Sequence, residues 1–389
     1  MQKFDLLASF DTEKYHLTLG GFYPSTHIKY KYLYVLSCIF NLFISWSQFL
    51  SMATFSYFNS SNLEKLSEIL LFCMTQFAFL NKLTNFVAQK TSLMKLEVML
   101  QSYLLTNVTQ KEIDVLENHI KEGRLLAKVY RVLCFLVVLF YALFPFLDDR
   151  SGESHKFPLP CWFPFDEIKY YYQVFFMEIL SIAVGAWINS NIDILTVMMC
   201  VLATAEFEVL RNRLATILQP LSTSASIAEG DALVKTKLRD CVNQYDELLC
   251  LVNQIEITFS KGIFVQFFCS VIVICLTGFQ MIVISFNSMQ FFLLIVYFSC
   301  MMCQVAMYCW YGHTVMESSD KIRDACYLAD WNESDLIVQK SLLMIMERAK
   351  RPAILRAGNF FELNIPTLMK ILRSSYSYFA VLQRLYGKK

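Results

Sequence analysis

The sequence predicts an all-α membrane protein with seven transmembrane helices. Of its 389 residues, 56% are hydrophobic, and the mean hydropathy is +0.43. That is more apolar surface than a soluble chain of this length normally buries. Residues 262–316 contain no Asp, Glu, Lys or Arg. Because one spanning helix needs about 20 residues, this stretch must fold back on itself. We expect the turn near Asn287 and Ser288.

The other apolar windows bring the count to seven. They lie at residues 32–55, 67–88, 125–147, 168–202 and 366–386. Lys82 interrupts the second window, so a neighbouring helix or a polar cavity must accommodate it. The fourth window is long and contains Glu178 and Asp193. We interpret it as a helix that leaves the membrane and continues toward Arg211.

The distribution of basic residues predicts the orientation. With the N-terminus inside, the inner segments hold 22 Lys and Arg residues and the outer segments hold 7. Basic residues are enriched on the cytoplasmic side of membrane proteins. The sequence therefore predicts a cytoplasmic N-terminus and an extracellular C-terminus, which is opposite to a G-protein-coupled receptor.

No enzyme signature is present. There is no phosphate-binding glycine loop and no paired metal-binding histidines, since the 5 histidines fall in different segments. Most of the 13 cysteines lie in apolar spans or inner loops, where packed, reduced thiols are expected. We expect no catalysis, no cofactor, no metal and no nucleic-acid partner.

The outer segment 157–166 combines three prolines with four aromatic residues, so it should be stiff. It either caps a cavity or is an ordinary interfacial aromatic anchor. These residues alone favour neither interpretation.

The last span, 366–386, is unusually polar, with Lys370, Arg373 and several serines. Such side chains at bilayer depth normally face a protein interior or a water-filled path. Asn364 should cap this helix, and Pro366 is tolerated in its first turn. One face runs from hydroxylated to apolar, through Ser374, Ser377, Tyr378, Val381 and Leu385. This face predicts a pore with an apolar gate; the alternative is a stripe packed within the monomer.

The C-terminal region resembles the signature of insect odorant receptors. The similar residues are 357–363, Thr367, 371–372 and 375–379, together with Trp331 and residues 325–327 in the preceding inner region. Residues 164–166 resemble the second outer loop of the same family. The length, the seven spans and the inside N-terminus also agree. Residues 1–300 resemble the family in the arrangement of their spans more than in the identity of individual residues.

This resemblance implies an odorant receptor that is a subunit of an odorant-gated, nonselective cation channel. Four subunits would surround a pore lined by the seventh spans and would be joined by a cytosolic anchor domain. The chain looks like a tuned subunit that assembles with a shared co-receptor, since it lacks the co-receptor's long inner loop. By position, Val381 and Leu385 would form the gate. Arg384 departs from the uncharged polar residue of the co-receptor, and it either turns away from the pore or discourages cations.

The resemblance also implies an odorant pocket among the second to sixth spans, in the outer half of the membrane. Depth along the spans selects eight candidate ligand-binding residues: Phe72, Gln76, Tyr141, Phe144, Tyr172, Phe176, Met177 and Phe279. For each of them, plain packing is the alternative. A mostly apolar pocket suits a small volatile ester, alcohol, terpene or aromatic compound.

The expected organisation places the cytoplasmic N-terminus at 1–31 and the first four spans at 32–210. A cytosolic helical loop follows at 211–258, and the fifth and sixth spans lie at 259–312. Anchor helices occupy 313–365, and the pore helix with a short extracellular tail occupies 366–389. We expect a multi-pass protein of the plasma membrane in the dendrite of a sensory neuron. The alternatives are a gustatory-type receptor channel of the same superfamily, a G-protein-coupled receptor and a transporter.

Overall fold

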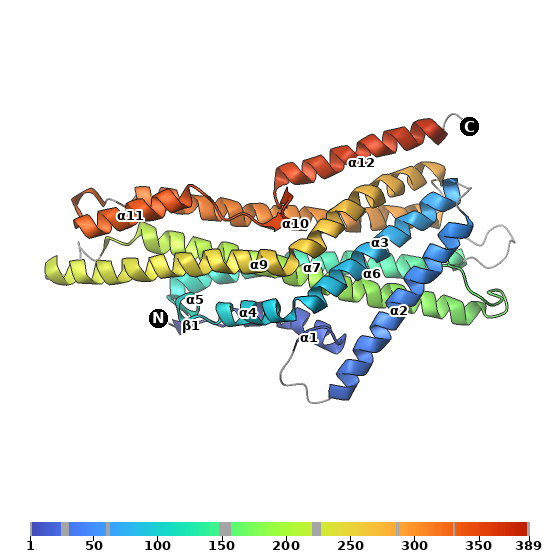
Figure 1. Cartoon of the computed structure of the whole chain (residues 1–389), viewed down its shortest axis with the longest axis horizontal. Coiled ribbons are helices and arrows are strands. Elements are labelled where there is room, and N and C mark those ends of the chain that lie inside the picture. The colour runs from blue at the N-terminus through green and yellow to red at the C-terminus, as the bar shows by residue number, and fades with distance from the viewer. Residues whose placement is uncertain are drawn as a thin grey trace.

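Long helices run side by side along the whole molecule (Figure 1). The computed structural model describes residues 2–24, 31–59, 63–147, 157–219, 227–284, 286, 288–329 and 331–386. Each of the seven expected spans is helical. The helices are α2 (Lys31–Phe58), α3 (Leu63–Ala88), α6 (Gln110–Leu147), α7 (Tyr171–Ala215), α9 (Ile227–Val283), α10 (Met289–Tyr327) and α12 (Ile365–Tyr386).

The chain reverses direction between α9 and α10, as the sequence predicts. Helix α9 ends at Val283 and α10 begins at Met289. The Ser288 hydroxyl accepts a hydrogen bond from the Gln290 amide at 3.1 Å and so caps α10. Asn287 lies outside the described residues.

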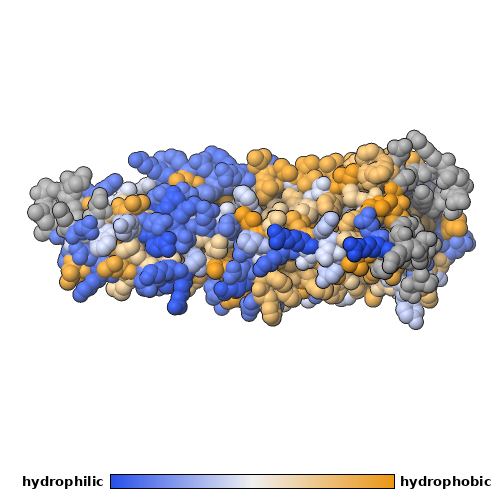
Figure 2. All heavy atoms as spheres, turned by 90° about the horizontal axis from the view of Figure 1, so that it is seen from above, coloured by the Kyte–Doolittle hydropathy of each residue, from blue (hydrophilic) through white to orange (hydrophobic). Residues whose placement is uncertain are grey.

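The molecule has an apolar half and a polar half. Figure 2 shows hydrophobic side chains gathered over one half of its length and hydrophilic ones over the other. Within the described residues, α2, α3, α6, α9 and α10 are long and apolar enough to cross a membrane. The N-terminus lies in the polar half and the C-terminus at the far end of the apolar half (Figure 1).

Short elements complete the polar half. They are a 3-10 turn (Leu7–Phe10), α1 (Asp11–Leu19), α4 (Lys90–Leu100), α5 (Tyr103–Thr106), a second 3-10 turn (Trp331–Glu333) and α11 (Leu336–Ala349). Strands β1 (Gln2–Lys3) and β2 (Asn107–Val108) pair antiparallel, as do β3 (Arg356–Ala357) and β4 (Phe361–Glu362).

The second hairpin corrects part of the expected anchor helices at 313–365, because residues 356–357 and 361–362 are strands. Gly358 and Asn359 have φ angles of 60° and 64°, in the left-handed region, so the chain turns there instead of continuing as a helix. A Cβ on Gly358 would lie 2.6 Å from the Phe264 ring, which adds a steric reason for glycine. The hairpin directs the chain into α12.

Helix α7 is the centre of the bundle. Every residue from 190 to 207 is buried. A helix that is buried on all sides needs no polar face, and this stretch is mainly apolar, with Asp193 and Glu206 as its two buried acidic residues. It packs against α6, α9 and α10. The helix continues past Arg211 to Ala215, as the sequence predicts, and Asp193 is fully buried within it.

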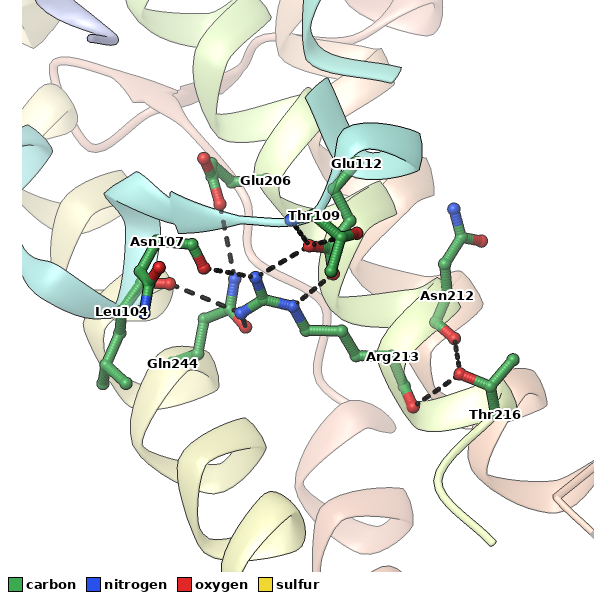
Figure 3. A network of polar contacts seen from close by, with 9 residues as sticks. All are labelled: Leu104, Asn107, Thr109, Glu112, Glu206, Asn212, Arg213, Thr216 and Gln244. Atoms are coloured by element: carbon green, nitrogen blue, oxygen red, sulfur yellow. Dashed lines mark hydrogen bonds and ion pairs between the residues drawn. The ribbon is translucent and has the colours of Figure 1, made fainter. Parts of the chain in front are cut away.

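Arg213 joins four segments of the polar half (Figure 3). Its guanidinium donates to the Glu112 carboxylate of α6 at 2.6 and 3.2 Å and to the Gln244 side chain of α9 at 2.9 Å. It also donates to the backbone carbonyls of Leu104 and Asn107 at 3.4 and 3.1 Å. Burial works against ionisation of Glu112, yet hydrogen bonds from Arg213 and Thr109 keep its pKa below the usual range. This network fixes the start of α6 against the end of α7.

Glu206, next to this network and past the predicted end of the fourth span, makes stability depend on pH. Burial raises its pKa from 4.5 to about 8, although Arg213 and Gln244 oppose the shift. Between these values the folded state holds a proton that the unfolded state has lost, so stability falls as pH rises. We expect Glu206→Gln to remove this slope and to raise the melting temperature above pH 8.

Thermal unfolding in nanodiscs at pH 5.5 and 8.5 measures the difference. The matched control is Glu117→Gln, because the Glu117 side chain is 48% exposed and pairs with the exposed Lys121. This control should keep the wild-type slope. An unchanged slope in Glu206→Gln would contradict the assignment.

Candidate functional site: a cavity beside a buried ion pair

An internal cavity of about 130 Å³ lies in the apolar half, between α2, α3, α6, α7 and α10. Its wall is mainly apolar and aromatic, with amide and hydroxyl groups at a few points. The lining residues are Gln48, Met52, Phe72, Thr75, Gln76, Phe79, Tyr130, Cys134, Val137, Tyr141, Leu159, Ile182, Gly185, Ala186, Asn189, Tyr297, Cys300, Met301 and Gln304. Such a cavity has the character of a small-molecule site.

Three of the eight predicted ligand residues line this cavity: Phe72, Gln76 and Tyr141. The ring of Phe72 lies 5.6 Å from that of Tyr141 and 6.1 Å from that of Tyr297, centroid to centroid, in edge contacts. The Gln76 amide donates to the Ser45 carbonyl at 3.1 Å. The Tyr141 hydroxyl is buried and has no hydrogen-bond partner among the described residues. It is a free donor at the cavity wall.

The structure places four other candidates away from this cavity. Tyr172 and Phe176 are 75% and 68% exposed on α7. Met177 lines a separate, outer chamber. Phe279 is buried on α9, a helix that contributes nothing to the cavity lining. The side chain of Phe144 lies outside the described part of the chain.

Depth along a span predicts the level of a residue but not the face of the helix on which it lies. On α7 the cavity face is formed by Ile182, Gly185, Ala186 and Asn189, at steps of three and four. Tyr172 and Phe176 belong to a neighbouring face. No residue of α10, the sixth span, was among the candidates, although its Tyr297, Cys300, Met301 and Gln304 have the same spacing and line the cavity. Tyr297 and Gln304 recur at helical spacing within a span that has no charged residues, and this pattern could have indicated the cavity face of α10.

A buried ion pair lies next to three of the cavity-lining residues, Tyr130, Asn189 and Gln304. Lys82 Nζ lies 2.5 Å from Asp193 Oδ1, and both side chains are almost completely buried. Lys82 also donates to Asn189 Oδ1 at 2.9 Å. The sequence predicts that a neighbouring helix or a polar cavity accommodates Lys82, and Asp193 of the neighbouring α7 does so. The structure shows that each neutralises the other.

Asp193 is held by donors from three further groups. Tyr308 donates to Oδ1 at 2.5 Å, while Tyr130 and Gln304 donate to Oδ2 at 2.9 and 2.5 Å. Gln304 in turn accepts a hydrogen bond from Gln266 of α9 at 2.9 Å. One carboxylate thus connects α3, α6, α7 and α10, and through Gln304 it reaches α9. Tyr130, Asn189 and Gln304 also line the cavity.

Helix α12 lies at the edge of the bundle and packs on α9 and α10. The Asn364 side chain accepts from the Thr367 amide at 2.9 Å, which confirms the predicted cap. A Cβ on Gly312 of α10 would lie 2.3 Å from Leu363, so glycine there permits the close approach of the chain that starts α12. The position of α12 is therefore fixed at its first turn.

The two faces of α12 differ. Thr367, Ile371 and Ser375 are buried against the bundle. In contrast Ser374, Ser377, Tyr378 and Val381 are exposed. The alternative of a stripe packed within the monomer is thus wrong for these four residues, and pore lining stays a prediction. The Leu385 side chain lies outside the described residues, while Arg384 is exposed.

Comparison with known proteins agrees with this architecture. The family model described as 7tm Odorant receptor matches residues 62–376. Putative odorant receptor 85d of Drosophila melanogaster is 25% identical over 319 residues, covering 78% of this chain and 74% of the relative. Odorant receptor 94a of the same species is 23% identical over 346 residues, covering 86% and 84%.

A solved structure has the same fold. The olfactory receptor OR5 from Machilis hrabei, determined in complex with eugenol, superposes with a TM-score of 0.82. The superposition covers 98% of each chain at 15% identity. The helical membrane fold and the match over most of the sequence agree: the chain belongs to the insect odorant receptor family and is a multi-pass membrane receptor, not an enzyme.

Proposed function

We propose that this receptor is the tuned subunit of an odorant-gated, nonselective cation channel that assembles with a shared co-receptor around a central pore. The observation that carries the proposal is the exposed face of α12. Ser374, Ser377, Tyr378 and Val381 follow one another along this face and have no place in the core of the chain. Polar side chains in a spanning helix need a wet environment or a partner, and a pore between subunits supplies both.

The 130 Å³ cavity is the proposed odorant site. An apolar cavity of about 150 Å³ accommodates benzene, so this cavity fits a ligand with one ring or a short chain. The Tyr141 hydroxyl is available to donate to a carbonyl or ether oxygen. The related OR5 has been solved with eugenol, an oxygenated aromatic compound, and this supports the same ligand class here.

The polar network offers a path from the cavity to the pore helix. Gln304 touches the cavity and accepts a hydrogen bond from Gln266 of α9. Helix α9 is also the main support of α12, and a Cβ on Gly278 of α9 would lie 3.4 Å from the Phe379 ring. A ligand that shifts Gln304 therefore acts on the helix that holds the pore helix. Ligand binding would then stabilise one arrangement of the bundle more than another, which is what a ligand must do to open a channel.

The expected orientation follows from the excess of basic residues in the inner segments. The N-terminus and the polar half would lie in the cytoplasm, where residues 211–258 and 313–365 form the contacts between subunits. The C-terminus would be extracellular. The plasma membrane of a sensory dendrite is the proposed location.

Odorant-evoked current with and without a co-receptor tests this function. Cells expressing both chains should show a fast cation current that persists when G-protein signalling is blocked, and cells expressing this chain alone should show little or none. In the same cells Tyr141→Phe should weaken the response to esters and ketones by about tenfold, the effect of one lost hydrogen bond. The response to hydrocarbons should be unchanged. A current that disappears with the G-protein block would contradict the channel mechanism.

A further inference from the structure

A second chamber, of about 380 Å³, lies on the outer side of the first cavity. It is enclosed by α2, by α7 and by the segment 157–166. Gln48 lines both spaces, and its side-chain oxygen accepts a hydrogen bond from Ser181. Gln48 and Ser181 therefore both line the outer chamber, and Gln48 borders the first cavity as well.

The outer segment is fixed to α2 on one side of the chamber. The Ser51 hydroxyl donates to the Trp162 carbonyl at 2.6 Å, and the Trp162 amide donates to the Ser51 carbonyl at 3.4 Å. The Trp162 ring packs 6.0 Å from that of Phe58, centroid to centroid. Of the two interpretations of this segment from the sequence, the structure supports the one in which it covers a cavity.

Glu178 of α7 lines the chamber and is only 3% exposed. Its Oε2 accepts from the Leu159 amide at 3.2 Å, whereas Oε1 has no hydrogen-bond partner among the described residues. The neighbouring side chains are the Cys161 thiol, a weak donor, and a second carboxyl group, that of Glu167. Among the described residues no cation pairs with Glu178. An ionised buried carboxylate normally requires one; without a cation the group keeps its proton.

Three aromatic side chains face the same space: Trp162, Phe163 and Phe165. The rings of Phe163 and Phe165 lie 5.4 Å apart, centroid to centroid. Aromatic faces attract ammonium groups, and the attraction is stronger where water is excluded. A carboxyl group with no counter-charge among the described residues, in a chamber that three aromatic rings also line, has the chemistry for a cation that carries apolar substituents.

We propose that the outer chamber binds a small protonated amine. The ammonium group would donate to Glu178 Oε1, and the alkyl or aryl group would pack on Trp162, Phe163 and Phe165. This site is separate from the proposed odorant cavity and does not depend on channel activity. The amine occupies the outer side of Gln48 and Ser181, where it modulates access to the inner cavity.

Direct binding to the full chain in nanodiscs tests this site. The probe is 3-methylbutylammonium, compared by calorimetry with 3-methylbutan-1-ol, which has the same carbon skeleton without the charge. Wild type should bind the ammonium at least about tenfold more tightly than the alcohol. Glu178→Gln should bind the ammonium at least about tenfold more weakly than wild type, because losing a buried charged hydrogen bond has an effect of this size.

Asp166→Asn is the matched control, because it removes an exposed carboxylate from the same outer segment without altering the chamber lining. It should bind the ammonium as wild type does. If Glu178→Gln does not fold, Phe165→Leu tests the aromatic part, since Phe165 is 46% exposed; its affinity should fall several-fold. Equal affinities for ammonium and alcohol, or an unchanged affinity in Glu178→Gln, would overturn the proposal. Binding without any channel current would disprove the proposed function only.

Discussion

Replacing Asp193 by Asn is expected to remove most of the folded receptor from the cell surface. The Lys82 side chain is only 4% exposed, so its charge stays buried after the change. Its hydrogen-bond partners among the described residues would then be the neutral Asn189 and the introduced amide. Removing one partner of a buried ion pair costs about 3–5 kcal/mol, a large share of the stability of a typical protein. Surface labelling and size-exclusion chromatography of the tagged receptor measure the loss.

A second substitution separates the charge from the packing. Lys82→Met removes the stranded charge and keeps most of the side-chain volume, so the double variant Lys82→Met, Asp193→Asn should recover much of the lost surface expression. Asp114→Asn, at an exposed position of α6, should match wild type. Without recovery in the double variant, the ion pair would not be the cause of the defect.

Replacing Val381 by Ser should give a receptor that conducts without odorant. In the proposed pore, an apolar ring at this position closes the path by excluding water, and a hydroxyl group allows water to enter. Val381 is 54% exposed in the chain, so the substitution leaves no cavity in the core. We expect a basal cation current several-fold above wild type, measured by whole-cell recording in cells that also express the co-receptor.

Tyr376→Ser is the control on the same helix. Tyr376 is 71% exposed but lies on a different face from Val381, five residues and about 140° away around the helix axis. This variant should keep a low basal current. If both substitutions raise it equally, loosening of α12 and not hydration of a gate would be the explanation.

The sequence predicted the helices well because their causes are local. The length and apolar composition of each span and the cap at Asn364 can be recognised in the amino-acid sequence. Each predicted span is a helix in the structure. The hairpin before α12 was missed although Gly358 and Asn359 are residues that favour left-handed turns. The same segment carries the family signature. Similarity of amino-acid sequence does not by itself define the backbone conformation.

Contacts between helices could not be predicted in the same way. Lys82 and Asp193 are 111 positions apart, and nothing in either span states that they meet. The cavity likewise depends on how each helix is rotated about its axis. Phe72, Gln76 and Tyr141 face inward, while Tyr172 and Phe176 at a suitable level face outward. Packing decides this rotation, and packing involves all helices at once.

The central claim is that α12 lines a pore that opens when odorant binds. Thiol modification of the variant Ser377→Cys tests this claim most directly. A charged thiol reagent is applied from outside to cells expressing this variant and the co-receptor, and the odorant-evoked current is recorded. Ser377 precedes Val381 on the path from the inner end, so the reagent must pass the gate. The account predicts rapid loss of current when odorant is present, slow loss when it is absent, and no effect on wild type. An odorant current that stays intact while the introduced thiol is fully labelled would contradict it.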